Sequence, residues 1–147
     1  RAMGVSPLYA WNRTVAKAEA LAAEFGAEAV TDMAAFSPKA LSLVVGTVPG
    51  STGVTLPAAL LQQHKPAVLD AAYIPRMTPL LSGAQQAGCT LCFGADMLFE
   101  QACAQFEIWT GRAAPRQAMA TAISEVCAEP GLDTPARIKE AIAGPVC

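Results

Sequence analysis

The chain has 147 residues, of which 53% are hydrophobic and 15% charged, and its net charge is -2 at pH 7. This composition predicts a soluble globular domain, and a slightly acidic chain lacks the basic face that nucleic acid or an anionic membrane requires. No apolar run reaches the ~18 residues of a membrane span. Residues 1–4 show neither an initiating methionine nor a signal-peptide pattern, so we expect a fragment of a larger protein.

Strands and helices are expected to alternate along the chain. Thr14 is a suitable N-cap for a helix that Gly26 ends, and the apolar run at residues 41–45 is typical of a strand buried on both faces of a parallel sheet. The predicted strands cover residues 7–11, 28–30, 41–45, 67–71 and 89–93, and the predicted helices cover residues 15–25, 57–63, 80–87, 95–110, 115–127 and, more weakly, 136–143. This alternation predicts a parallel α/β sheet with right-handed crossovers, in which ligands bind at the carboxyl ends of the strands.

The five cysteines are an odd number and outline no disulfide framework, so a reducing cytoplasmic compartment is expected. Cys89 and Cys92 form a C-x-x-C, a spacing that zinc sites and thiol redox sites share. Residues three apart on a strand point to opposite faces, and neither a second C-x-x-C nor a neighbouring histidine completes a metal site. Both are therefore predicted to be ordinary buried thiols, and no metal is expected.

The end of the first predicted strand carries Asn12, Arg13 and Thr14, and Lys17 follows one turn into the helix. Dinucleotide folds that bind NAD usually place an acidic residue here, on the ribose 2′-hydroxyl. Two cations and two neutral donors at a helix N-terminus instead suit a phosphate dianion, and Arg13 could also stack on an adenine. The alternative is that Thr14 is only a cap and that Arg13 and Lys17 are solvated.

The segment at residues 94–101 joins the last predicted strand to the longest helix. Gly94 at the strand end lets a ligand approach the backbone, and Gln101 lies among apolar residues two turns into the helix. A glutamine in that position can also simply bond the backbone or water. Tyr73, after another strand, can likewise be a loop aromatic with its hydroxyl in water, and Asp70 is expected to tie down its own loop.

Four blocks of the sequence, in order and spacing, resemble the shikimate dehydrogenases over roughly residues 5 to 120. Asn12-Arg13-Thr14 with Lys17 resembles their 2′-phosphate motif. Residues 70–81 resemble their D-x-x-Y-x-P-x-x-T-P-L-L block, and residues 94–101 resemble their G-x-x-M-L-x-x-Q segment, which the Trp109-Thr110-Gly111 stretch follows. Residues 4–7 and 111–115 are most similar to the C-terminal domain of the fungal pentafunctional AROM polypeptide.

The resemblance implies a Rossmann-like doubly wound parallel sheet that lacks its first strand and Gly-rich loop and is followed by C-terminal helices. It implies a partial NADP-binding domain at residues 1–93, helices returning to the substrate side at 94–127, and a tail with a weak helix at 128–147. In the 3-2-1-4-5-6 strand order the absent strand is central, so a gap or a rearranged pairing is expected.

The activity that the resemblance implies for the parent protein is NADP-dependent interconversion of 3-dehydroshikimate and shikimate, in the biosynthesis of chorismate and the aromatic amino acids. The implied substrate-binding residues are Tyr73 and Gln101. The implied NADP-binding residues are Asn12, Arg13, Thr14, Lys17, Thr47, Val48, Gly94, Met97 and Leu98. The catalytic Lys–Asp pair of the family lies in an N-terminal substrate domain, which is the expected partner together with other AROM domains, so this chain alone is expected to be inactive and not to hold NADP tightly.

Two alternatives remain open from the sequence. One is a quinate dehydrogenase, whose relatives often prefer NAD. Arg13 and Lys17 argue against a preference for NAD. The other is a non-catalytic, metabolite-sensing repressor of the quinate pathway that is homologous to AROM. Retention of Arg13, Tyr73 and Gln101 favours the enzyme, because a sensor need not keep the residues that bind the cofactor phosphate.

Overall fold

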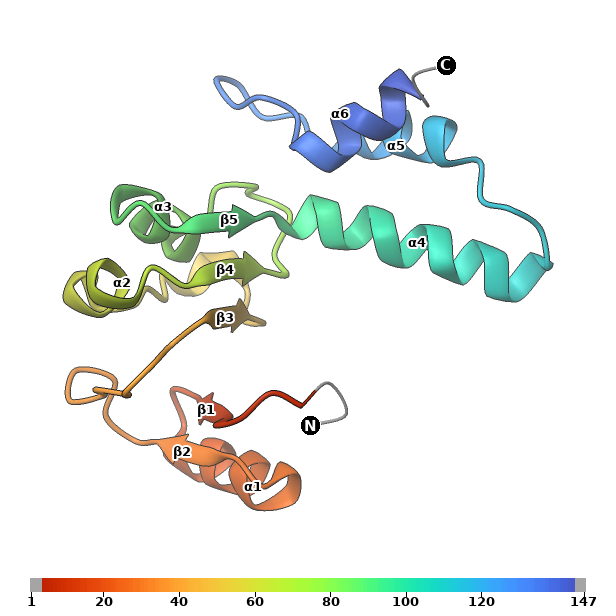
Figure 1. The fold of residues 1–147 in the computed structure, drawn as a ribbon. Helices are drawn as coiled ribbons and strands as arrows, with labels where there is room; N and C mark the ends of the chain where they lie inside the picture. The colour runs from red at the N-terminus through yellow and green to blue at the C-terminus, as the bar shows by residue number, and fades with distance from the viewer. Residues whose placement is uncertain (1–3, 145–147) are drawn as a thin grey trace. The chain divides into compact units, whose positions relative to one another are not determined.

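The computed structural model describes residues 4–144, and the chain divides into two units, Arg1–Lys39 and Ala40–Cys147. The first unit contains a two-stranded parallel sheet and the second a three-stranded parallel sheet (Figure 1). Helices follow or connect the strands in both units, as the alternating pattern of the sequence predicts.

The first unit packs one helix against its small sheet. Its elements are β1 (Tyr9–Trp11), α1 (Val15–Phe25) and β2 (Glu28–Val30). The two strands pair in parallel with Ala10 opposite Ala29, and Ala18 and Ala22 form the buried side of α1. Gly26 ends α1 with a φ of 62°, a left-handed conformation that glycine adopts without strain. The predicted helix at residues 15–25 and strand at 28–30 are confirmed.

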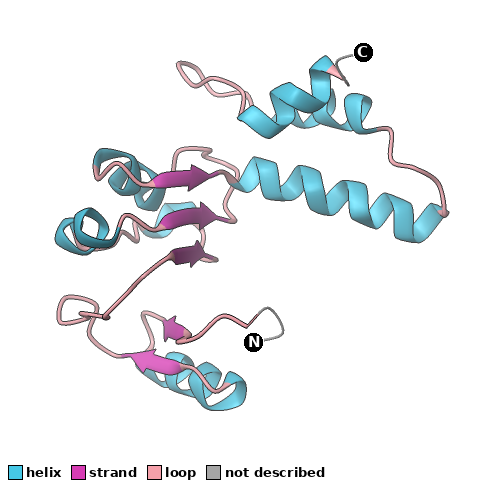
Figure 2. Cartoon of the chain, viewed as in Figure 1, coloured by secondary structure: helices cyan, strands magenta, loops and turns pink. Residues whose placement is uncertain are grey.

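The second unit begins with an α/β sheet whose strands all run the same way (Figure 2). Its elements are β3 (Leu43–Gly46), the 3-10 turn η1 (Gly50–Thr52), α2 (Ala58–His64), β4 (Ala67–Asp70), α3 (Pro79–Gln86) and β5 (Thr90–Cys92). The strand order is β3-β4-β5, and Val44, Val68 and Leu91 share one register position across it. On that face they pack with Leu61 of α2 and Leu81 of α3, which forms one hydrophobic core.

The opposite face of this sheet is more open than the sequence suggests. Leu43 and Val45, which flank Val44 on β3, are 52% and 53% exposed. The expectation of a strand buried on both faces is therefore wrong for residues 41–45 in this structure. The reason is that α2 and α3 both contribute to the core on the Val44 side, which leaves the alternate residues of the edge strand uncovered.

Three helices follow the sheet: α4 (Gly94–Thr110), α5 (Arg116–Val126) and α6 (Ala136–Ala143). They enclose a second core around Phe99, which is fully buried. The core residues are Ala95, Phe99, Cys103, Ala120, Cys127 and Ile138. The far end of α4 is open, since Ile108 and Trp109 are 79% and 76% exposed. None of the helices within residues 4–144 is long and apolar enough to cross a membrane.

The two sheets are separate, because no strand of the described chain pairs β1 or β2 with β3. Within each unit the strands pair in parallel, β1 with β2 in the first and β3-β4-β5 in the second. The expected interruption is thus present, and the predicted α/β class with parallel strands and C-terminal helices is confirmed.

Candidate functional site

The start of α1 presents positive charge and free donors. Asn12 Oδ1 accepts the N–H of Thr14 at 2.9 Å, and Thr14 is the N-cap, although its own hydroxyl makes no capping bond. Arg13, Thr14 and Lys17 are exposed, and neither cation forms an ion pair with any residue between 4 and 144. Because N–H groups in the first turn of a helix lack helical partners, this turn suits an anion, and its residues fit a phosphate group.

The carboxyl ends of β3 and β4 lie at one edge of the second unit's sheet, where Asp70 organises the loop that follows β4. The Asp70 side chain is 2% exposed; its Oδ1 accepts the Ala72 N–H at 3.2 Å and its Oδ2 accepts the Thr78 hydroxyl at 2.7 Å. The carboxylate therefore ties down its own loop, as the sequence predicts. Thr47, just after β3, is exposed, and Val48 is half-buried.

Gly94 joins this loop to the beginning of α4. A Cβ on Gly94 would lie 2.4 Å from the Ala72 carbonyl oxygen and 2.7 Å from that of Ala71, closer than real atoms approach. Glycine is therefore required by the chain's own loop. The close approach of a ligand to this backbone, which the sequence suggests, stays a prediction. The contact brings the segment that carries Tyr73 against the helix that carries Gln101.

The predicted substrate residues are available to a ligand. Tyr73 is 40% exposed and Gln101 is also exposed, and neither side chain makes a hydrogen bond within the described residues. Met97 and Leu98, in the first turns of α4, are half-buried. The structure thus divides the predicted residues between the two units. The start of α1 carries Asn12, Arg13, Thr14 and Lys17, and the second unit carries Thr47, Val48, Tyr73, Gly94, Met97, Leu98 and Gln101.

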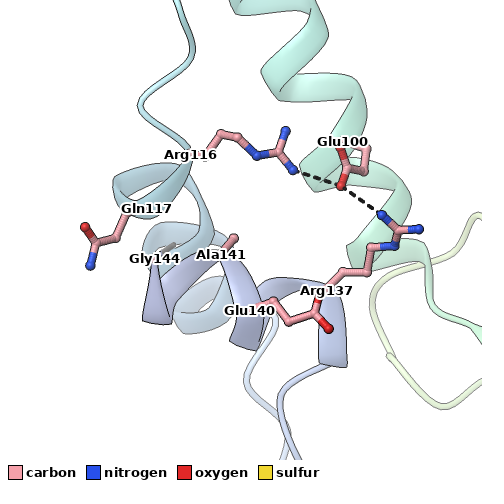
Figure 3. A pocket seen from close by; sticks show the side chains of 7 residues that line it. All are labelled: Glu100, Arg116, Gln117, Arg137, Glu140, Ala141 and Gly144. Carbon is pink, nitrogen blue, oxygen red and sulfur yellow. Dashed lines mark hydrogen bonds and ion pairs between the residues drawn. The ribbon is translucent and has the colours of Figure 1, made fainter. Parts of the chain in front are cut away.

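A charged cluster on α4 has no counterpart among the residues predicted from the sequence. Glu100 Oε1 lies 2.9 Å from Arg116 Nη2 of α5 and 3.8 Å from Arg137 Nη1 of α6. Figure 3 shows both guanidinium groups pointing toward Glu100 at a pocket of about 380 Å³ between the three helices. Asp96 lies one turn before Glu100 on the same side of α4. The four-residue spacing of the two acidic side chains can be read from the sequence, but the arginines that contact Glu100 come from distant segments.

Burial raises the pKa of two groups near this cluster, Asp96 and Cys92. It raises the pKa of Asp96, although the N–H of Phe93 and the positive charges of Arg137 and Arg76 oppose the rise. Burial also raises the pKa of the Cys92 thiol, and the nearby Asp96 charge adds to the effect.

Burial raises the pKa of each of the four cysteine thiols that the structure describes, Cys89, Cys92, Cys103 and Cys127. Cys89 is half-buried and its Sγ donates to the Leu61 carbonyl at 3.7 Å, while burial raises the pKa of its thiol. A thiol with a raised pKa is a weak nucleophile and a weak metal ligand. Across residues 4–144 no group of three or more histidine, cysteine or acidic side chains could hold a metal ion. Cys147 lies outside the described residues.

Residues 94–123 match the family described as "Shikimate 5'-dehydrogenase C-terminal domain". The chain is 41% identical over 116 residues to the Shikimate dehydrogenase (NADP(+)) of Natronomonas pharaonis. The aligned segment covers 76% of this chain and 44% of that protein. It is 38% identical over 127 residues to the Pentafunctional AROM polypeptide of Yarrowia lipolytica, covering 80% of this chain and 8% of that polypeptide.

Solved structures with a similar fold include a shikimate 5-dehydrogenase. The crystal structure of shikimate 5-dehydrogenase from Thermus thermophilus in complex with NADP(H) and shikimate matches with a TM-score of 0.69 at 29% identity. That match covers 87% of this chain and 48% of the Thermus protein. The chain therefore spans about half the length of these two shikimate dehydrogenases and a small part of the AROM polypeptide.

Proposed function

We propose that this chain, which is homologous to the C-terminal part of shikimate dehydrogenases, forms the NADP-binding part of an enzyme that interconverts 3-dehydroshikimate and shikimate. The observation that carries the proposal is the match at residues 94–123, which contains Gly94 and Gln101 in the geometry described above. The pathway would be the biosynthesis of chorismate and the aromatic amino acids, in the cytoplasm.

In this proposal Asn12, Arg13, Thr14 and Lys17 hold the adenosine 2′-phosphate of NADP. The exposed cations at the start of α1, which form no ion pair within residues 4–144, support this role, since a phosphate dianion gains charge-assisted hydrogen bonds there. Asn12 contributes by fixing the backbone at Thr14, so that the first turn of α1 is formed before the phosphate arrives.

The second unit would hold the reacting end of the cofactor and part of the substrate. Thr47 and Val48 line the cofactor crevice, the Gly94 backbone meets the nicotinamide amide, and Met97 and Leu98 pack beside the ring. The exposed side chains of Tyr73 and Gln101 face the carboxylate and hydroxyl groups of the substrate. NADP supplies the hydride chemistry, and these residues orient the two reactants.

The chain would act with the part of the relatives that it does not span. Residues 1–93 bind NADP and residues 94–127 return to the substrate side, and the proposed tail that begins at residue 128 carries α6, which packs into the core around Phe99. The proton-handling Lys–Asp pair and most of the substrate pocket belong to an N-terminal substrate domain, and further AROM domains are additional partners. We expect the 147-residue chain alone to show no turnover and to hold NADP weakly.

The test uses the longer protein encoded by the natural reading frame extended upstream to the length of the relatives. Reduction of NADP and of NAD is followed spectroscopically with shikimate and then with quinate. We expect NADP-dependent oxidation of shikimate. Shikimate or quinate binding without turnover would instead establish the repressor, and a preference for quinate would establish the quinate dehydrogenase.

A matched pair of variants tests the phosphate site. Arg13→Asp should weaken NADP binding by about 10- to 100-fold, because it removes a charge-assisted hydrogen bond and adds repulsion, and should leave NAD binding nearly unchanged. Lys39→Asp makes the same charge change at another exposed position of the first unit and should leave both affinities unchanged. Equal weakening by the two variants, or equal loss of NAD and NADP binding, would contradict the assignment.

A further inference from the structure

Arg76 is a buried cation at the end of the loop that carries Tyr73. It is 4% exposed, which is unusual for arginine unless the charge is compensated. Its Nε is buried and has no hydrogen-bond partner within residues 4–144. A buried arginine costs more than an apolar side chain of similar size, so stability alone does not account for it.

Arg76 connects three segments that are far apart in the sequence. Its backbone N–H donates to Glu129 Oε2 at 2.8 Å, which links the loop to the connection between α5 and α6. Its guanidinium carbon lies 5.8 Å from the centroid of the Phe93 ring, and Phe93 is the N-cap of α4. The loop, the start of α4 and the α5–α6 connection therefore meet at one residue, which contacts Phe93 through its side chain and Glu129 through its backbone N–H.

The charge of Arg76 faces the first turn of α4. Asp96 is 9% exposed, its Oδ2 accepts the Phe93 N–H at 3.4 Å, and its Oδ1 has no partner in the described chain. The positive charge of Arg76 lowers the pKa of Asp96 against the effect of burial. Arg76 and Asp96 are thus two buried ionisable groups, one in the loop after β4 and the other in the first turn of α4, and Gly94 joins these two segments by its contact with the Ala72 carbonyl.

We infer that Arg76 is a positioning residue: its side chain holds the loop after β4 against the start of α4 and so fixes Tyr73 relative to Gln101, while its backbone N–H ties the same loop to Glu129. Tyr73 lies three residues before Arg76 in the same loop, and Gln101 lies on α4, whose first turn contains Asp96. A displacement of the Arg76 side chain would therefore change the position of Tyr73 relative to Gln101. The role of these two residues toward substrate rests on the function proposed above, whereas the mechanical coupling of Arg76 to Tyr73 does not.

The coupling is testable on the 147-residue chain without any activity, because the chain contains two tyrosines, Tyr9 and Tyr73. Labelling with 3-fluorotyrosine gives two ¹⁹F resonances, which Tyr73→Phe assigns. Tyr9 stacks edge-to-face on Phe36 in the first unit, with ring centroids 4.9 Å apart, and serves as an internal reference.

Arg76→Met should shift or broaden the Tyr73 resonance and leave the Tyr9 resonance in place. Arg112→Met, which removes an exposed arginine elsewhere in the same unit, should change neither. If Arg76→Met unfolds the second unit, the Tyr73 resonance will have the same chemical shift as in the urea-denatured chain. In that case Arg76→Lys becomes the decisive variant. An unchanged Tyr73 resonance in a folded Arg76 variant overturns the inference.

The longer protein separates this inference from the proposed function. In an active enzyme, Arg76→Met should raise KM for shikimate and lower kcat/KM about 10- to 100-fold, with the Kd of NADP changed less than about twofold. A purely structural role would lower Tm and the fraction of active enzyme but leave KM unchanged. An inactive wild type would refute the proposed function, and the ¹⁹F result would still decide whether Arg76 positions Tyr73.

Discussion

The carbonyl oxygen of Ala72 lies 2.4 Å from the point where a side chain on Gly94 would begin. Gly94→Ala must therefore displace either the loop after β4 or the first turn of α4. Overpacking of this kind costs about 1–3 kcal/mol or more, and here the obstacle is backbone, which cannot rotate away. We expect urea denaturation to show a loss of at least that size.

Gly111→Ala, at the other end of α4, is the matched control. Gly111 has a φ of 65° and open space where a Cβ would lie, so alanine there meets only the strain of the left-handed conformation, about 1 kcal/mol. Equal losses at the two ends would show that the close approach of Ala72 does not determine the cost at Gly94.

Thr78 holds the buried carboxylate of Asp70 and also caps α3, where its hydroxyl accepts the Leu81 N–H at 3.3 Å. Thr78→Val keeps the shape but removes both bonds, and the buried carboxylate loses the hydroxyl that donates to its Oδ2. The expected loss is about 2–4 kcal/mol in the free energy of unfolding. Thr78→Ser retains the hydroxyl and should lose less than half as much, and similar losses for the two variants would contradict this account.

The raised pKa of Asp96 predicts a pH dependence with a definite sign. A carboxyl group whose pKa is higher in the folded state contributes stability that is fully present below its unfolded pKa, about 3.9, and is lost as the pH rises through the folded pKa. The stability of Asp96→Asn relative to the wild type should therefore increase as the pH rises from about 4 through that range. Thermal melts across the pH series measure it.

Asp133→Asn is the control for this series, because the Asp133 side chain is 96% exposed. Its stability relative to the wild type should change little across the same pH range. A relative stability of Asp96→Asn that fell with rising pH would mean that the carboxylate, and not the neutral acid, is favoured in the folded protein.

The Glu100–Arg116 pair is expected to contribute little through charge. The Arg116 side chain is 47% exposed, so a double-mutant cycle with Glu100→Gln and Arg116→Gln should give a coupling below about 1 kcal/mol that shrinks in 1 M salt. Arg116 also lies over the Phe99 ring, with its guanidinium carbon 4.7 Å from the centroid. Arg116→Gln should therefore destabilise the unit by more than Glu100→Gln does, and the reverse order would show that the ring contact contributes less than the ion pair.

Most element boundaries could be predicted because local signals set them. Gly26 ends α1 and Gly111 ends α4, both in the left-handed conformation, and Pro135 directly precedes α6 at the predicted residue. The glycine at position 94 also stands out in the sequence, but its contact with Ala72 could not be predicted, because the obstructing carbonyl belongs to a loop more than twenty residues away.

The burial of Arg76 had no signal in the sequence. An arginine in a loop between Pro75 and Met77 is normally solvated, and its contacts with Glu129 and Phe93 exist only after distant segments pack together. The one-sided exposure of β3 was missed for a related reason. A short apolar run carries no information about how many faces of the strand will be covered.

The small core of the first unit has a consequence for ligand binding. Its buried side chains include Ala18, Ala22 and Val30, and a body of this size gains little stability from its own interior. If Arg13 and Lys17 bind the cofactor phosphate only when α1 is formed, the apparent affinity equals the intrinsic affinity multiplied by the fraction of molecules in which α1 is formed. NADP titrations would then report on the folding equilibrium of α1 as much as on the phosphate contacts, and a substitution that stabilises the helix would tighten binding without touching the ligand.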